Sequence, residues 1–130
     1  MSVERISSSK APKPLARYSQ AVRAGNTLHL QGIMPIDPLT GQVVAGDIET
    51  HARRVFESMK AILESAGMRM ENIVKVTAFL ADLADYSKFN EVYNTYFATD
   101  LPPARTTIGA NLLMGARLEV DAVAYLPTRS

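Results

Sequence analysis

The chain has 130 residues, 14 Lys+Arg against 13 Asp+Glu, 47% hydrophobic residues and no cysteine. This size and composition predict a single soluble domain over residues 1–130. A net charge of +1, with basic residues scattered along the chain, lacks the electrostatic footprint of a nucleic-acid or membrane partner. The absence of cysteine excludes disulfide scaffolds, thiolate zinc sites, iron–sulfur clusters and cysteine nucleophiles.

Residues 1–10 lack the apolar core of a signal peptide, and no stretch approaches the ~20 apolar residues of a membrane span. We therefore expect a cytoplasmic protein without a membrane partner. The Ser- and Pro-containing stretch 7–14 has no periodic apolar face, so residues 1–15 are expected to be a flexible or loosely packed lead-in. Oligomerisation would add to the stability of so small a domain.

Two strands joined by a turn are predicted next. Residues 27–31 alternate between apolar and polar, which is the period-two pattern of a half-buried strand. Residues 25–26 predict a turn, and residues 18–22 are the expected hairpin partner. The Pro and Gly of residues 37–41 predict a second turn.

The clearest predicted helix follows. Apolar residues between positions 48 and 66 recur at spacings of three and four and form one stripe. Asp47 is the expected N-cap and Gly67 the expected C′ residue. Residues 73–80 alternate and predict a strand. The expected shared face of that strand consists of Val74, Val76, Ala78 and Leu80.

A shorter helix is predicted after Asp85, with Tyr86, Phe89, Tyr93 and Phe97 on one side, followed by strands over residues 104–110 and 117–125. The order β-β-α-β-α-β-β predicts an α+β domain with a mixed sheet packed on one side by two helices. The other sheet face is expected to be polar, either wet or an intersubunit surface that holds a site. Its expected polar residues are Arg105, Thr107, Arg117, Glu119 and Asp121.

Several candidate motifs predict no chemistry. His29 and His51 lie in different elements without a catalytic or metal-binding spacing, so structural or surface roles are predicted for both. The glycine spacing of residues 41–48 matches a P-loop, but Asp47 stands where the phosphate-binding Lys is required. Nucleotide binding by this route is excluded.

Arg105 and Glu119 each leave two interpretations open. Arg105 follows two prolines at the start of a strand, and its planar guanidinium suits a substrate carboxylate. The alternative is a structural pair with an acid on the neighbouring strand. Glu119 could hold a water or exchange a proton if it shares a pocket with Arg105. Its alternative is a cross-strand salt bridge to Arg105 or Arg117.

Taken together and in order, a set of segments over about residues 16–124 resembles the RidA/YjgF family of reactive intermediate deaminases. These segments are Tyr18-Ser19-Gln20-Ala21-Val22, Gly32 with Pro35, residues 37–41, residues 74–82, Asn90 with Tyr93, Pro103-Ala104-Arg105 and residues 118–121. The resemblance implies a chorismate-mutase-like fold and a homotrimer whose sheets line a central barrel, with three sites in clefts between subunits. It also implies hydrolysis of enamine or imine intermediates, such as 2-aminoacrylate and 2-imino acids, to 2-oxo acids and ammonia without a cofactor or metal.

The resemblance assigns a role to each matching residue. Arg105 would clamp the substrate carboxylate, and Glu119 would orient or activate the attacking water. Tyr18 would pack near the substrate, and the Thr107 backbone would lie beside the imine nitrogen. Three further residues complete the expected substrate-binding set: Asn90, Gln31 and Gly32.

The sequence departs from the family pattern near the expected site. Ala16-Arg17 replaces Gly-Pro, Gln31-Gly32-Ile33 replaces Ser-Gly-Gln, and Thr107 replaces a common Cys. The cation of Arg17 leaves open a larger or doubly acidic substrate such as 2-aminomuconate, although a solvated Arg17 without a role is the simpler interpretation. A further alternative is a non-catalytic trimer that binds a small ligand or a protein partner. Some family members are described as ribonucleases, but the near-neutral charge gives RNA binding little support.

Overall fold

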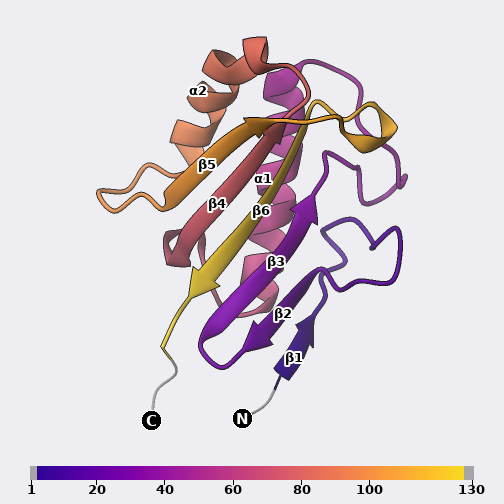
Figure 1. Ribbon diagram of the computed structural model, residues 1–130. Helices are drawn as coiled ribbons and strands as arrows, with labels where there is room; N and C mark the ends of the chain where they lie inside the picture. The colour runs from indigo at the N-terminus through magenta and orange to yellow at the C-terminus, as the bar shows by residue number, and fades with distance from the viewer. Residues whose placement is uncertain (1–2, 128–130) are drawn as a thin grey trace.

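The computed structural model describes residues 3–127 and has two layers, a six-stranded sheet and two helices that cover one of its faces (Figure 1). The helices are α1 (Ile48–Ser65) and α2 (Tyr86–Tyr96). The strands are β1 (Val3–Ile6), β2 (Ala21–Ala24), β3 (Thr27–Ile33), β4 (Ile73–Leu80), β5 (Ala104–Gly109) and β6 (Leu118–Tyr125). The predicted α+β class with a mixed sheet is confirmed. None of the helices in the described residues is long and apolar enough to cross a membrane.

The strand order is β1-β2-β3-β6-β4-β5. All neighbouring strands are antiparallel except β4 and β5, which run parallel. A parallel pair needs a crossover connection, and α2 provides it between β4 and β5. The last strand, β6, therefore lies in the middle of the sheet, while β5 forms an edge strand beside α2 (Figure 1).

Helix α1 begins and ends where its caps predict. The Asp47 carboxylate accepts a hydrogen bond from the Thr50 N–H at 2.9 Å, and Gly67 adopts a left-handed φ of +74° after the last turn. The fully buried Phe56 ring anchors α1 to the second helix and the residue that follows it. Its aromatic neighbours are Phe89, Tyr93, Tyr96 and Phe97, with ring centroids 5.2–6.3 Å away. This apolar contact fixes α2 over the sheet.

The expectation of a loosely packed N-terminal segment is wrong for its described part, which starts at Val3. Residues 3–6 form β1 and pair with β2. The following loop is held by Gln20, whose buried amide accepts a hydrogen bond from the Ser8 N–H at 2.6 Å and donates to the Pro12 carbonyl at 2.8 Å. These features have no local sequence pattern, because they depend on a partner strand and on one distant side chain. Residues 1–2 and 128–130 lie outside the described residues.

Two strand assignments also need correction. The hairpin partner of β3, predicted over residues 18–22, is β2 over residues 21–24, so the prediction places it three residues too early. In β4, Ile73 is buried and Val74 is 49% exposed. A register irregularity between Ile73 and Lys75 adds one residue, which turns Val74 away from the predicted apolar face.

Replacement of Gln20 by Ala should destabilise the protein by about 1–3 kcal/mol, because buried backbone groups of the N-terminal loop lose their partner. Gln42→Ala is the matched control, since Gln42 is exposed and surface substitutions usually change stability by less than about 0.5 kcal/mol. Urea unfolding of both variants measures the difference. Equal midpoints for the two variants would contradict this role of Gln20.

Candidate active site

The sheet register places Arg105 and Glu119 on opposite faces of the sheet. Arg105 aligns with Val76, which is fully buried beneath the helices. Glu119 aligns with Phe79 on the face that the helices leave open. Aligned residues on neighbouring strands project to the same side. The expectation that Arg105 and Thr107 share the open face with Glu119 and Asp121 is therefore wrong, because the parity of β5 is set by its pairing with β4.

Arg105 is half-buried against α2 and is held by neutral groups. Its guanidinium donates hydrogen bonds to Asn90 Oδ1 at 2.7 Å and to the Tyr86 hydroxyl at 2.8 Å. The Tyr93 ring lies beneath it, with the ring centroid 4.5 Å from the guanidinium carbon, within the range of a cation–π contact. No carboxylate among residues 3–127 forms an ion pair with Arg105. The structural alternative, a pair with an acid, is not observed.

Asn90 belongs to the predicted substrate-binding set and contacts Arg105, whereas the aromatic partners Tyr86 and Tyr93 were not predicted as site residues. Tyr86, Asn90 and Tyr93 follow one another at spacings of four and three, so they lie on one face of α2. This spacing was the only sequence feature that could have indicated a site on α2, but it is equally typical of a helix face that packs in the core. Thr107 lies on the same side of β5, and its Oγ1 is buried without a hydrogen-bond partner in the described part of the chain.

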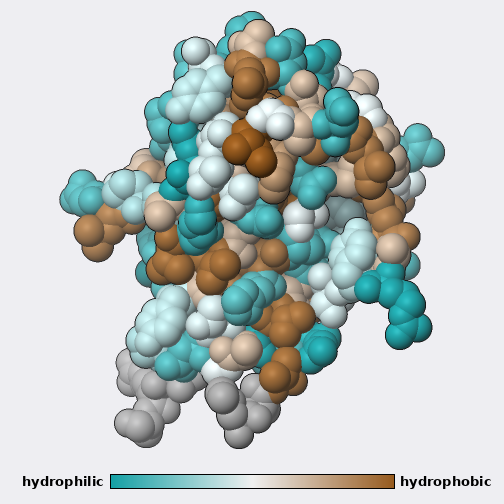
Figure 2. Space-filling model, in the orientation of Figure 1, coloured by the Kyte–Doolittle hydropathy of each residue, from teal (hydrophilic) through white to brown (hydrophobic). Residues whose placement is uncertain are grey.

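Glu119 lies in a hollow of about 440 Å³ on the other face of the sheet. Figure 2 shows that this open side mixes hydrophobic and hydrophilic patches. Tyr18, Gln31 and Gly32 line the hollow with Glu119, so the structure brings four of the predicted residues together. The Tyr18 hydroxyl accepts a hydrogen bond from the Leu15 N–H at 3.1 Å. The remaining lining residues are Leu15, Ala16, Ser19, Met34 and Leu113; the sequence did not identify these as a group because they come from three separate loops.

Gly32 gives the Glu119 carboxylate its space. A Cβ atom at position 32 would lie 2.2 Å from Glu119 Oε2, far inside van der Waals contact. Gly32 also lies where the pairing of β3 with β6 changes register, between Leu30 and Ile33. A residue with any side chain at this position would push the carboxylate out of its place.

The Glu119 carboxylate has no hydrogen bond or ion pair within residues 3–127. The predicted alternative, a salt bridge to Arg105 or Arg117, is therefore not formed. Burial raises the pKa of Glu119 above its usual value, and the nearby negative charge of Asp121 raises this pKa further. A carboxyl group with a raised pKa and free oxygens can hold a water and exchange protons with it.

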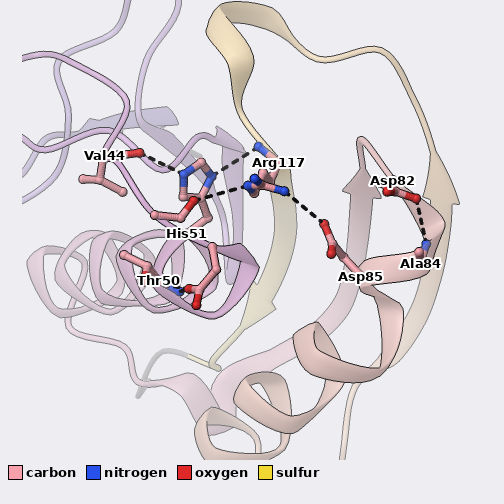
Figure 3. A network of polar contacts seen from close by, with 9 residues as sticks. Val44, Thr50, His51, Asp82, Ala84, Asp85 and Arg117 are labelled. Atoms are coloured by element: carbon pink, nitrogen blue, oxygen red, sulfur yellow. Dashed lines mark hydrogen bonds and ion pairs between the residues drawn. The ribbon is translucent and has the colours of Figure 1, made fainter.

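Arg117 does not join Glu119 on the open face, contrary to expectation. It precedes β6, and its side chain turns toward α1 and the start of α2 (Figure 3). Its guanidinium contacts the Gly46 carbonyl at 3.3 Å and the Asp85 carboxylate at 3.8 Å. His51 is buried beside it, in agreement with the structural role predicted for that histidine. In the region the structure describes, no cluster of His, Asp or Glu is arranged to hold a metal ion.

The fold and these two groups of residues define a known class of protein. A family profile described as Endoribonuclease L-PSP matches residues 8–126, and the chain belongs to this family, which contains the Rid and RutC proteins. A RutC family protein of Pyrococcus abyssi is 46% identical and covers 96% of this chain and 98% of its own. The 2-iminobutanoate/2-iminopropanoate deaminase of Rattus norvegicus is 40% identical and covers 92% and 87%. The crystal structure of a Rid family protein from Yersinia pestis superposes with a TM-score of 0.93 at 34% identity, covering 96% and 100%.

Glu119→Gln should stabilise the protein at neutral pH. The raised pKa means that the charged carboxylate is disfavoured in the folded state, so the wild type loses stability as the pH rises through the folded pKa. The gain in the variant should vanish below the ordinary carboxyl pKa, where the wild-type group is protonated in both states. Thermal unfolding at several pH values measures this gain. Glu91→Gln, at an exposed position, is the control, and an equal pH-dependent gain there would contradict the assignment.

Proposed function

We propose that this protein hydrolyses small 2-imino acids and their enamine tautomers, such as those derived from 2-aminoacrylate, to 2-oxo acids and ammonia. Homologues at about 40% identity are named 2-iminobutanoate/2-iminopropanoate deaminase, which supports this activity. The observation that carries the proposal is the guanidinium of Arg105, which is positioned by neutral groups and has no carboxylate partner in residues 3–127.

Arg105 would bind the substrate carboxylate. Asn90 and Tyr86 accept hydrogen bonds from Nη1 and Nη2 of Arg105, so the planar group is held in one orientation while its positive charge is not neutralised. A carboxylate bound to this group would form charge-assisted hydrogen bonds of defined geometry. Fixing the carboxylate fixes the adjacent imine carbon for attack.

Glu119 would position the attacking water. Water adds to the electrophilic carbon of the iminium group, and Glu119 accepts a proton from it as the C–O bond forms. Glu119 returns this proton to the nitrogen of the tetrahedral intermediate and takes up the hydroxyl proton as the C–N bond breaks and the C=O bond of the 2-oxo acid forms. Ammonia leaves with that proton as ammonium, which restores the Glu119 carboxylate. The raised pKa of Glu119 brings this group nearer the range in which it can both accept and return a proton.

Such a site would have to be shared between two subunits. Arg105 and Glu119 face opposite sides of one sheet, so a single small substrate cannot contact both groups of the same chain. A neighbouring subunit that places its open sheet face against the β5 edge and α2 would bring its Glu119 hollow to Arg105. The homotrimer implied by the family resemblance would form three such sites in a closed ring.

The walls of the hollow favour a monocarboxylic substrate over a doubly acidic one such as 2-aminomuconate. Leu15, Met34 and Leu113 form an apolar wall beside Glu119, whereas Arg17 is exposed and does not line the hollow. A second carboxylate in this hollow would lie beside Glu119 without a cation to neutralise it. An imino acid with a short apolar side chain meets no such cost.

Arg105→Lys should lower kcat/KM by about 10²-fold, because an ammonium group keeps the charge but cannot form the planar paired contact. The assay generates 2-iminopropanoate or 2-iminobutanoate with an amino-acid oxidase and catalase and measures competition with semicarbazide. Arg69→Lys, at an exposed surface ion pair, is the control. A variant that is folded and fully active would rule out the carboxylate clamp, and an inactive wild type would leave ligand binding as the alternative.

Mixing Arg105→Ala and Glu119→Gln subunits should restore activity that neither variant has alone. In randomly mixed 1:1 trimers, about a quarter of the shared sites combine an intact Arg105 with an intact Glu119. Wild type mixed 1:1 with the double variant distinguishes the models, since shared sites give about a quarter of the activity and single-chain sites about half. Light scattering on the mixture checks that about three chains assemble. Failure of the single variants to complement would contradict the shared site.

A further inference from the structure

His51 lies outside the candidate site but contacts the loops that build it. The side chain is almost fully buried, with 3% of the residue exposed. Its Nε2 lies 2.8 Å from the Val44 carbonyl, and its Nδ1 lies 3.2 Å from the Arg117 amide nitrogen (Figure 3). Since a carbonyl only accepts and an amide N–H only donates, the imidazole must be neutral, with its proton on Nε2.

The two hydrogen bonds join the loops that wall the Glu119 hollow. Val44 belongs to the loop after β3, which contributes Met34, and Arg117 ends the loop before β6, which contributes Leu113. The loops also contact each other through a small apolar cluster apart from the main core. This cluster contains Met34, Ile36 and Ala116, with Val43 and Leu112 packed against it.

The loop before β6 needs such an attachment. Met114 adopts a left-handed φ of +59°, a conformation that costs energy for a residue with a side chain and persists only where the surroundings impose it. Leu113 is 70% exposed, so little packing holds the tip of the loop. The loop is therefore held at its two ends, by the packing of Leu112 and Ala116 and by the backbone of Arg117, whose carbonyl also accepts a hydrogen bond from the Ala81 N–H at 3.1 Å.

Arg117 extends the connection to the Arg105 side of the sheet. Its guanidinium contacts the Gly46 carbonyl and, at 3.8 Å, the Asp85 carboxylate. Asp85 immediately precedes Tyr86, whose hydroxyl accepts a hydrogen bond from Arg105. These contacts, of which only the His51 end is buried, thus connect both loops of the hollow with the start of the helix that holds Arg105.

We propose that neutral His51 is a positioning residue for imine hydrolysis, which holds the loops that carry Met34 and Leu113 in place as walls of the Glu119 hollow. Its protonation would place an N–H on Nδ1 against the Arg117 N–H, so the hydrogen bond that anchors the loop before β6 would be lost. The part of this inference that concerns activity rests on the proposed function, because it is measured as kcat/KM for imine hydrolysis.

The charges around His51 set the direction of its pH response. Arg117 opposes protonation, while Asp47 at the N-terminus of α1 and Asp85 before α2 favour it. Burial is the largest influence and lowers the pKa of His51 below its ordinary value of 6.5. The free energy of unfolding of the wild type should therefore fall as the pH drops below about 6.5, the ordinary pKa of histidine. Loop order should be lost at a lower pH, where His51 of the folded protein takes up its proton.

Three variants on α1 test the proposal. His51→Gln keeps a donor for Val44 and an acceptor for the Arg117 N–H but cannot titrate, whereas His51→Leu removes both hydrogen bonds. Ser58→Ala controls for loss of another buried polar group of the same helix. At pH 8 we expect His51→Leu to lower kcat/KM by up to about 10²-fold, with His51→Gln and Ser58→Ala within about twofold of the wild type.

The ratio of kcat/KM between His51→Gln and the wild type cancels the titration of the substrate and of Glu119. This ratio should be constant above about pH 6.5 and should rise below it. A ratio that rises already above pH 6.5, or a His51→Gln variant as impaired as His51→Leu, would overturn the proposal.

A measurement without substrate separates this inference from the proposed function. Amide hydrogen exchange at Arg117 should be about tenfold faster or more in His51→Leu than in the wild type, and protected again in His51→Gln. If the wild type has no imine hydrolase activity but shows this exchange pattern, the proposed function fails while the His51 anchor stands. Unchanged exchange at Arg117 in His51→Leu would overturn the anchor itself.

Discussion

The position of β4 between β5 and β6 is the constraint on which the rest of the structure depends. Side chains of a strand alternate between the two faces of a sheet, and the pairings of β4 with β5 and β6 fix this alternation for both neighbours. Arg105 is paired with Val76 and therefore points to the helix side of the sheet. Glu119 is paired with Phe79 and therefore points to the open side. A shift of either pairing by one residue would exchange the faces.

In the proposed shared site, this constraint would produce two half-sites of different character, the residues around Arg105 and those around Glu119. The Arg105 half-site is rigid, because α2 is anchored by the aromatic contacts of Phe56 and offers a row of side chains at helical spacing. The Glu119 half-site is built mainly from loops around a glycine that leaves room for the carboxylate. The sequence of a loop can change without disturbing the sheet. The residues around Glu119 would therefore contact the substrate side chain and determine specificity, while Arg105 would bind the substrate carboxylate.

Both half-sites retain charges that a purely structural protein would neutralise. Arg105 lies among neutral and aromatic groups, and Glu119 lies beside Asp121 in a half-buried hollow. Leaving such groups without an opposite charge costs stability. The apolar core between the sheet and the helices offsets this cost, and the contacts of His51, Arg117 and Asp85 connect the loops outside that core.

Much of the fold was predictable because it follows from local patterns. The helix over residues 48–65 has a stripe of apolar residues, an N-cap and a terminal glycine that all agree, and the core strands alternate cleanly. The short strand β1 and the Gln20 clamp were not predictable, since four residues with two charges carry no pattern and a single amide gives no sign of a loop twelve residues away. The exposure of Val74 was not predictable either, because it results from a register irregularity in the pairing of β4 with β6.

The sequence by itself determined the identity of Arg105, Glu119, Tyr18 and Gly32 as an ordered set, and with it the family. Tertiary structure alone decided that Arg105 and Glu119 face apart, because the parity of a strand depends on which partner residue it is paired with and not on its own composition. It also decided which apolar residues wall the hollow and that Arg117 turns toward His51. These contacts join segments far apart along the chain, so no local pattern encodes them.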